Sequence, residues 1–415
     1  MSPERGLQLV SGTKKETTME VLEHKQIGQK LRLFHLQEEA PGMVFWHPAG
    51  FVLVRAMEDA IRRRVVSDGF VEVRTPQLVR RSVWAASGHW ENFRAHMFAF
   101  GEQGREEALK PVSCPCHIQI VERMAPSYRD LPVRIAEFGV VHRDEDDGAL
   151  NGLFRLRQFT QDDGHIFCEK EQIEDEVVRF CTSVRALYEA FGFSSFSVAL
   201  STRPAQRAGD DSMWDVAEQV LDTAARCAGL QPSLQVGEGA FYGPKLEFSL
   251  QDRLGRSWQC GTIQLDFAMP ERFGLSYVDP QGFKARPVML HRAIFGSIER
   301  FLAVLLEHHQ RALPGWLAPE QVRVLPISDA QAHYARTILE ALRLRGLRAS
   351  VGAGGQTLSR AIVDAHDAGV PFLAIVGKRE VAASKVALRD RNGAQRVLEL
   401  DAAATELGAL CKAPL

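Results

Sequence analysis

Two cysteines and a histidine lie close together in the segment KPVSCPCHIQI, which runs from Lys110 to Ile120. Cys114, Cys116 and His117 have side chains that bind zinc, but two cysteines can also form a redox pair or be buried thiols. The local spacing leaves these alternatives open. The chain has seven cysteines, an odd number scattered over 415 residues, so reduced thiols are expected rather than a disulfide framework.

Charged and aromatic residues alternate in two segments that are rich in β-forming residues. In FGVVHRDE, Arg143 and Glu145 are two positions apart, so they share one face of a predicted strand. This pair could bind a phosphate and a base amine, or it could be a surface ion pair. In FRLRQFTQDDGHIF, alternate positions again carry polar or aromatic side chains, namely Arg155, Arg157, Phe159, Gln161, Asp163 and His165. Such a face is costly to bury without a polar ligand, and arginine beside an aromatic ring suits a nucleotide.

A third segment, PVMLHRAIFGSIERF, joins an apolar strand to a helix. His291 ends the strand, and Gly296, Ser297 and Arg300 follow at a spacing that places them near one face of the helix. A helix with glycine and arginine on one face can bring a cation close to a ligand. Spacing alone is equally compatible with a helix that carries one exposed arginine.

An α+β fold must position these residues. Amphipathic helices are predicted over residues 51–66, 171–191 and 213–229. The segments between them are rich in β-forming residues and follow one another more than they alternate with helices, and the first of them covers residues 70–79. This order predicts a mainly antiparallel sheet with packed helices.

The pattern changes after RALPGWLAPEQ, where proline, glycine and tryptophan interrupt it. Strands and helices then alternate, with one helix ending at Arg345 and the next beginning near Leu358, which predicts a small α/β domain with a largely parallel sheet. The expected divisions are a polar N-terminal extension over 1–22, a large domain over 23–316 and the small domain over 317–415.

Composition excludes several classes of protein. The chain is 45% hydrophobic, and no apolar run has the length of a membrane span. Its N-terminus lacks an apolar signal segment, and with reduced cysteines this predicts a cytoplasmic location. The net charge is −2 and the pI about 6.7, so no overall positive field attracts nucleic acid, and any such binding needs a local basic face.

Taken together, three segments resemble the signature motifs of class II aminoacyl-tRNA synthetases: DGFVEVRTPQL, HRDE with FRLRQFTQDD, and HRAIFGSIERF. The specific resemblance is to the threonyl-tRNA synthetase family. It is supported in order along the chain from Gly42 by GMVFWHPAG, SGHWENF, SYRDLP, LSTRP, GEGAFYGPKLEF, WQCGTIQLDF and WLAPEQV. The resemblance implies a class II antiparallel sheet with flanking helices in a catalytic domain over 23–316, followed by an α/β anticodon-binding domain. It also implies a homodimer formed through the DGFVEVRTP strand.

The family forms threonyl-adenylate from ATP and L-threonine and transfers threonine to tRNA(Thr). The resemblance implies one Zn²⁺ per chain on Cys114, His165 and His291, with Cys116 and His117 outside the ligand set, and Mg²⁺ bound with ATP. The zinc would accept the amine and hydroxyl of threonine, which excludes valine. The implied ATP-binding residues are Arg143, Glu145, Arg155, Phe159, Gln259, Thr262 and Arg300, of which Arg143 and Arg300 are catalytic. The implied threonine-binding residues are Gln161, Asp163, Tyr242, Lys245 and Gln264, and the implied anticodon-binding residues are Glu380 and Arg389.

Some features depart from the family pattern. Cys116, Gln158 and Met269 replace residues that are usually glycine, glycine and leucine, which fits either an inhibitor-resistant second copy or drift in an ordinary enzyme. We expect no N-terminal editing domain and therefore expect serine misactivation, because only a methyl group distinguishes serine from threonine.

The C-terminal domain has thirteen Lys/Arg against ten Asp/Glu from Ala318 onward, and a segment usually rich in basic residues carries only Arg360. Fewer phosphate contacts would weaken tRNA binding. An enzyme that makes an adenylate for an acceptor other than tRNA is therefore an alternative hypothesis, and a non-catalytic RNA-binding paralogue is another. The paralogue is disfavoured because the chain retains Cys114, His165, His291, Arg143 and Arg300, which a non-catalytic copy would have no reason to keep.

Overall fold

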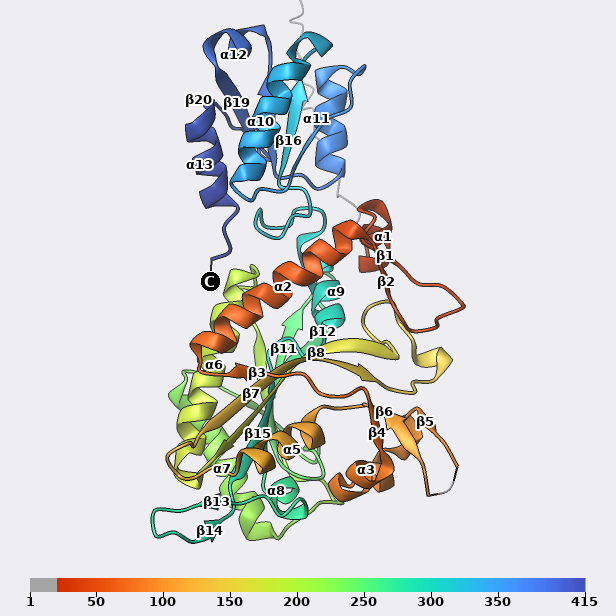
Figure 1. Ribbon diagram of the computed structural model, residues 1–415, viewed down its shortest axis with the longest axis vertical. Helices are drawn as coiled ribbons and strands as arrows, with labels where there is room; N and C mark the ends of the chain where they lie inside the picture. Colours follow the sequence, from red (N-terminus) through yellow and green to blue (C-terminus); the bar gives the residue numbers. More distant parts are fainter. Residues whose placement is uncertain (1–20, 103, 415) are drawn as a thin grey trace, which may run out of the picture.

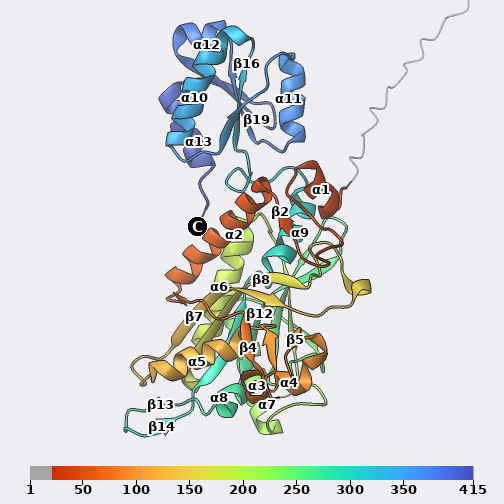
Figure 2. The same ribbon diagram turned by 45° about the vertical axis from the view of Figure 1, so that its right-hand side comes forward.

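The computed structural model describes residues 21–102 and 104–414, which form a larger domain and a smaller C-terminal domain stacked at one end of it (Figures 1 and 2). Most of the extension expected over 1–22 lies outside the described residues. Leu22 is buried, and its backbone N–H donates to Gln310 at 2.8 Å. None of the described helices has both the length and the apolar character needed to cross a membrane.

The larger domain contains nine of the described helices. They are α1 (His24–Lys30), α2 (Pro48–Ser67), α3 (Arg81–Ser87), α4 (His89–Asn92), α5 (Cys114–Met124), α6 (Ile173–Ala190), α7 (Asp211–Cys227), α8 (Ala268–Arg272) and α9 (Ile298–His309). The smaller domain contributes α10 (Ala332–Leu344), α11 (Leu358–Asp367), α12 (Lys378–Ala383) and α13 (Leu400–Leu410). Short 3₁₀ turns are η1 (Arg94–His96), η2 (Asp147–Ala149), η3 (Lys170–Gln172) and η4 (Asp329–Gln331). The helices predicted over 51–66, 171–191 and 213–229 are confirmed as α2, α6 and α7.

An eight-stranded sheet organises the larger domain in the order β10-β9-β11-β12-β15-β8-β7-β3. Its strands are β3 (Val71–Glu72), β7 (Val133–His142), β8 (Gln158–Cys168), β9 (Ser197–Ser201), β10 (Ser233–Gln235), β11 (Lys245–Gln251), β12 (Ser257–Asp266) and β15 (Val288–Ala293). Only the outermost pairs, β10–β9 and β3–β7, are parallel, so the prediction of a mainly antiparallel sheet is confirmed. Shorter sheets are formed by β1 (Phe34–His35) with β2 (Phe45–Trp46), by β4 (Leu78–Arg80), β6 (Glu107–Leu109) and β5 (Ala99–Phe100), and by β13 (Tyr277–Val278) with β14 (Lys284–Ala285).

The strand predicted over residues 70–79 is wrong as a single element. The chain forms β3, leaves the sheet around Pro76 and pairs again in β4. Proline has no N–H to donate to a strand partner. The backbone N–H of Thr75 donates instead to the Glu137 carboxylate at 2.8 Å. A buried side chain therefore replaces the expected backbone partner.

Helix α9 lies at the centre of the hydrophobic core. Phe301 is fully buried, stacks on Phe295 with ring centroids 3.7 Å apart, and meets the edge of Phe191. We expect Phe301→Ala to lower the free energy of unfolding by about 3–5 kcal/mol, because it removes a large apolar surface and leaves a cavity. Urea denaturation followed by tryptophan fluorescence would measure this. Leu344→Ala, at a side chain that is 89% exposed, is the control, and an equal loss in both variants would contradict the prediction.

The smaller domain has a five-stranded sheet in the order β17-β16-β18-β19-β20. The strands are β16 (Val322–Pro326), β17 (Ala349–Val351), β18 (Phe372–Val376), β19 (Lys385–Asp390) and β20 (Gln395–Glu399). The first two pairings are parallel and the last two antiparallel, so the prediction of a largely parallel sheet holds only for half of it. Asn392 and Gly393, with Gly393 at φ +90°, make a tight turn that folds β20 back on β19. The helices predicted to end at Arg345 and to begin near Leu358 are present.

Candidate active site

A cleft of about 250 Å³ opens where β7, β8 and β12 meet the start of α9. All the residues predicted to bind ATP line it: Arg143, Glu145, Arg155, Phe159, Gln259, Thr262 and Arg300. Gln161 and Gln264, predicted to bind threonine, line it too. Segments that are far apart in the sequence thus converge because the antiparallel order places β12, β15, β8 and β7 side by side.

Three guanidinium groups give the cleft its charge. Arg143 lies over the Phe159 ring at 5.1 Å, and burial together with the neighbouring Arg300 lowers its pKa. Arg300 donates from Nε to the backbone carbonyl of Phe154 at 3.0 Å. Arg155 lies 4.0 Å from the Glu145 carboxylate. Arginine remains protonated despite such shifts, so the cleft is suited to a polyanion with an adjacent aromatic platform.

Buried carboxylates shape the start of α9. Asp162 accepts from the backbone N–H groups of Ile294, Phe295 and Gly296 at 2.6, 3.0 and 2.9 Å, and burial raises its pKa to about 6. Glu299 accepts from the backbone N–H of Thr160 at 3.0 Å, and burial raises its pKa to about 7. Neither carboxylate lines the cleft. Sequence analysis did not single out either of them as a site residue.

The prediction that Gly296, Ser297 and Arg300 share a helix face is wrong, since α9 begins at Ile298. Gly296 has φ +76°, and a Cβ there would lie 2.4 Å from the Cys260 carbonyl oxygen. Ser297 is the N-cap, and its hydroxyl accepts from the Arg300 backbone N–H at 3.1 Å. A tight turn and a cap, rather than helical spacing, bring glycine and arginine to the cleft.

Cys114, His165 and His291 come together beside this cleft, with potential ligand atoms within 4.8 Å of one another, and all three are buried. Cys114 is the first residue of α5. His165 on β8 and His291 on β15 are direct cross-strand partners. Cys116 and His117 are buried but are not part of this group. One thiol and two imidazoles form a donor set that suits zinc with an open coordination position.

Hydrogen bonds orient the two imidazoles toward a common point. His165 Nε2 lies 3.1 Å from His291 Nδ1. The opposite nitrogens are engaged elsewhere: His291 Nε2 lies 2.9 Å from Asp266, and His165 Nδ1 lies 2.7 Å from His117 Nδ1. In the neutral tautomer that fits these contacts, His291 donates a hydrogen bond from Nε2–H to Asp266, which leaves a lone pair on Nδ1. A cation between the two facing nitrogens satisfies this arrangement, so the residues fit a metal ion.

The chain of contacts continues behind His165. His117 Nε2 lies 3.2 Å from Glu137, which also accepts from Lys110 Nζ and from the Thr75 hydroxyl. Burial disfavours the charged form of Glu137, but hydrogen bonds from His117 and Thr75 and the charge of Lys110 outweigh it and lower its pKa to about 2. An ionised Glu137 accepts a hydrogen bond from His117 Nε2–H, so His117 Nδ1 can accept one from His165 Nδ1–H. Carboxylate–histidine contacts of this kind orient metal ligands.

The thiol of Cys114 depends on a cation for its charge. Burial, and then the nearby carboxylates of Asp163 and Asp266, raise its pKa well above the usual value. A divalent ion reverses this balance, because a coordinating thiol is deprotonated outright. The same two carboxylates would offset the positive charge of a bound ion.

The other residues predicted to bind threonine adjoin this cluster. The Tyr242 hydroxyl donates to Gln264 at 2.6 Å, and its ring centroid lies 5.1 Å from that of His291. Asp163 lies 3.8 Å from His165 Nε2. Lys245 is the cross-strand partner of Gln264 and pairs with Glu247 at 2.7 Å.

Another buried histidine near the cleft escaped sequence analysis. His89 Nδ1 lies 2.8 Å from the Ser87 hydroxyl. Burial, and then nearby cationic groups that include Arg143, lower its pKa to about 4, so its imidazole is neutral near pH 7. In the sequence, only the position of His89 within the SGHWENF motif pointed to a role at the site.

Glu380 and Arg389 lie away from the cleft, in the smaller domain. Glu380 is in α12, which both views place at the end farthest from the larger domain, and its side chain accepts from the Gly377 N–H at 2.8 Å (Figures 1 and 2). Arg389 is on β19. The structure does not bring these residues to the cleft.

The three residues that depart from the family pattern lie near the site and make ordinary packing or hydrogen-bond contacts. Cys116 is buried beside the ligand cluster, and burial raises the pKa of its thiol. Met269 packs in the same apolar cluster as Cys114. Gln158 starts β8 and lies 3.3 Å from His142.

Both domains of the chain match known protein families. Residues 97–309 match the class II core domain of tRNA synthetases (G, H, P, S and T), and residues 321–410 match an anticodon-binding domain. Over 371 residues, the chain is 51% identical to a threonine–tRNA ligase of Methylococcus capsulatus and to one of Alkalilimnicola ehrlichii. These alignments cover 89% of the chain but 58% of each relative's length.

Solved structures share the fold. The RNA-binding domain of threonyl-tRNA synthetase from Cryptosporidium parvum superimposes with a TM-score of 0.91 at 40% identity, covering 95% of this chain and 99% of that one. A prolyl-tRNA synthetase from the same organism gives 0.71 at 15% identity, covering 94% of this chain and 74% of that one, which shows the shared fold alone. With the core match and the 40% identity, the chain belongs to the threonyl-tRNA synthetase family of class II aminoacyl-tRNA synthetases.

Proposed function

We propose that this protein activates L-threonine with ATP and transfers it to tRNA(Thr). The observation that carries the proposal is the continuity of the arginine-lined cleft with the Cys114, His165 and His291 cluster. Thr262 and Gln264 line the cleft from β12, and Gln264 is the cross-strand partner of His291. A nucleotide in the cleft and an amino acid on the cluster would therefore be neighbours.

Arg143 and Arg300 have the central roles in the activation step. The threonine carboxylate attacks the α-phosphorus of ATP, a bond to pyrophosphate breaks, and threonyl-adenylate forms. Arg143 would bind the α-phosphate and the carboxylate, so that the two are held in line. Arg155 and Arg300 would bind the outer phosphates together with Mg²⁺, and Phe159 and Glu145 would hold the adenine. Fixed positive charges of this kind stabilise the charge that builds on the phosphates.

Cys114, His165 and His291 would hold a Zn²⁺ ion, which supplies a Lewis acid for the substrate amine and hydroxyl. Asp163, Tyr242, Gln161, Lys245 and Gln264 would line the pocket around the amino acid. A pocket that binds the hydroxyl through fixed polar groups discriminates strongly against valine, which would leave those groups unpaired. Threonine would therefore be selected over valine because valine lacks the hydroxyl that these groups bind, and not because the two differ in size.

The smaller domain would bind the anticodon, with Glu380 and Arg389 as base-reading residues. The names of the relatives favour tRNA as the acceptor over the alternative of an acceptor other than tRNA. A homodimer would use the edge strand β3, where Val71 is 66% exposed. The seven cysteines, all within the described residues, form no disulfide, which fits a reducing compartment such as the cytoplasm.

The deciding experiment is transfer of labelled threonine to tRNA(Thr) by the purified protein, with adenylate formation followed in the same reaction. Charged tRNA supports the proposal. Adenylate without charged tRNA would move the function to another acceptor. Absence of threonine-dependent adenylate in zinc-loaded protein would overturn the proposal.

The contact of His117 with His165 yields a further prediction. His117→Ala removes the partner that orients the His165 ring, so we expect the affinity for Zn²⁺ to fall by about 10–100-fold. Competition with a chelator of known affinity measures this in the absence of substrates. His333→Ala, at an exposed histidine of α10, is the control. Unchanged affinity in a folded His117→Ala variant would contradict the orienting role.

A further inference from the structure

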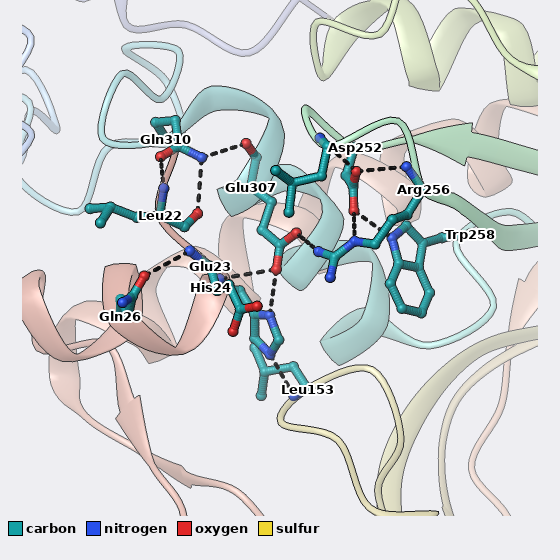
Figure 3. Close-up of polar contacts among 11 residues, drawn as sticks. Leu22, Glu23, His24, Gln26, Leu153, Asp252, Arg256, Trp258, Glu307 and Gln310 are labelled. Atoms are coloured by element: carbon teal, nitrogen blue, oxygen red, sulfur yellow. Dashed lines mark hydrogen bonds and ion pairs between the residues drawn. The ribbon is translucent and has the colours of Figure 1, made fainter. Parts of the chain in front are cut away.

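A polar network backs the part of the cleft wall that Leu153 and Phe154 form. It joins helix α1, the end of α9 and the turn between β11 and β12 (Figure 3). We propose that His24 of α1 is a positioning residue for the nucleotide cleft, acting through Leu153 and Phe154, which line it. The proposal rests on the proposed function, since it takes ATP as the ligand of the cleft.

Both ring nitrogens of His24 are engaged. His24 Nδ1 lies 2.7 Å from Glu307, and Nε2 accepts from the backbone N–H of Leu153 at 3.1 Å (Figure 3). The side chain of His24 is 2% exposed. Nδ1 must donate to the Glu307 carboxylate while Nε2 accepts from Leu153, which defines a neutral tautomer. The imidazole therefore bridges α9 and the cleft wall.

Glu307 connects this bridge to a second group of polar side chains. Its carboxylate also accepts from the His24 backbone N–H at 3.1 Å and pairs with Arg256. Arg256 pairs through Nε with Asp252 at 2.6 Å, and Asp252 accepts from the Trp258 indole at 2.9 Å (Figure 3). Glu307 and Asp252 are almost completely buried. Truncating one member of such a network leaves the others unpaired, which is costly.

The network closes on Phe154. The Phe154 ring stacks on Trp258 with centroids 3.6 Å apart and an interplanar angle of 5°. The edge of His24 meets the same ring at 4.5 Å, and Arg256 lies over it at 5.8 Å. The carbonyl of Phe154 accepts from Arg300 Nε at 3.0 Å. A shift of Phe154 would therefore move a guanidinium that faces the cleft.

The start of α1 is itself fixed. Leu22 donates to and accepts from the side-chain amide of Gln310, at 2.8 and 3.1 Å, and this amide also donates to the Glu307 carbonyl at 2.7 Å (Figure 3). Since α9 carries Arg300 at its other end, α1 and the cleft wall are held to the same helix. This explains why a helix remote in sequence can determine the position of cleft residues.

The test compares three substitutions of His24 in the full chain. His24→Ala removes both contacts; His24→Asn keeps a donor near the Nδ1 position but loses the acceptor for Leu153; His24→Gln keeps an acceptor near the Nε2 position. In threonine-dependent ATP–pyrophosphate exchange, we expect the KM for ATP to rise by about 10-fold in the alanine and asparagine variants, because displaced cleft residues bind the phosphates less well. The KM for threonine should stay within about twofold, and glutamine should restore most of the ATP affinity. Gln29→Ala, on the exposed face of α1, is the matched control.

Binding of a non-hydrolysable ATP analogue, measured by calorimetry, should show the same order of affinities. An unchanged KM for ATP in folded alanine and asparagine variants would overturn the positioning role. A merely structural role would lower the melting temperature and the active fraction and leave both KM values unchanged. Failure of the wild-type protein to bind the analogue would overturn the proposed function instead, so the two failures are distinguishable.

Discussion

Replacing Arg143 by glutamine is expected to lower the kcat/KM of threonine-dependent ATP–pyrophosphate exchange by about 10²–10³-fold. Arg143 stands over Phe159 at 5.1 Å and faces the cleft with Arg300, so its charge would act where the reacting phosphate lies. Glutamine keeps hydrogen-bonding capacity but loses the positive charge that the transition state requires.

The expected loss is in catalysis more than in folding. Within the described residues, the Arg143 side chain makes a single long hydrogen bond of 3.4 Å, to the Pro111 carbonyl, so its replacement costs little hydrogen bonding. The melting temperature should therefore remain close to that of the wild type. Arg336→Gln, at an exposed site in α10, is the control for loss of one charge. Equal exchange rates in the Arg143 and Arg336 variants would remove Arg143 from the catalytic set.

Replacing Cys114 by alanine is expected to abolish stoichiometric zinc binding and to lower threonine-dependent exchange by more than about 10²-fold. Loss of a direct ligand costs more than the 10–100-fold in metal affinity that follows loss of an outer partner. The nucleotide cleft does not include Cys114, so binding of an ATP analogue should be retained. Metal analysis and calorimetry measure the two properties separately.

Cys116 provides the matched control because it lies two residues away and is equally buried. Cys116→Ala should retain one zinc ion per chain, since this residue is outside the cluster of potential ligands. The opposite pattern, with zinc lost in the Cys116 variant and kept in the Cys114 variant, would show that the ligand was misassigned. The pair therefore resolves the ambiguity of the CPC segment.

Much of the fold could be predicted from local pattern. The helices α2, α6 and α7 have strong 3.6-residue periodicity over long segments, and such elements depend little on their surroundings. The strand expected over 70–79 was wrong because Pro76 cannot donate to a sheet, and the alternation on both sides of it concealed the break. Strand β20 was missed, although Asn392-Gly393 is a typical hairpin turn.

Some residues of the candidate site could be found from the sequence, and others could not. The residue types in the three motif segments indicated a nucleotide, and the family resemblance supplied Cys114, His165 and His291. Spacings of this size carry no local metal-binding signal, so periodicity could not have found the cluster. Asp162 and Glu299 could not be found either, because they act by holding backbone N–H groups behind the cleft.

By itself, then, the sequence determined the family, the order of elements and which side chains can bind phosphate or metal, because motif residues and periodicity are local properties. Tertiary structure alone decided which atoms meet. Strand pairing places His165 opposite His291, and the hydrogen bonds that these rings donate to His117 and Asp266 select the nitrogens that face each other. The bridge from His24 to Leu153 joins residues 129 positions apart. Contacts between such distant residues depend on the packing of α1, α9 and the sheet, which no local pattern records.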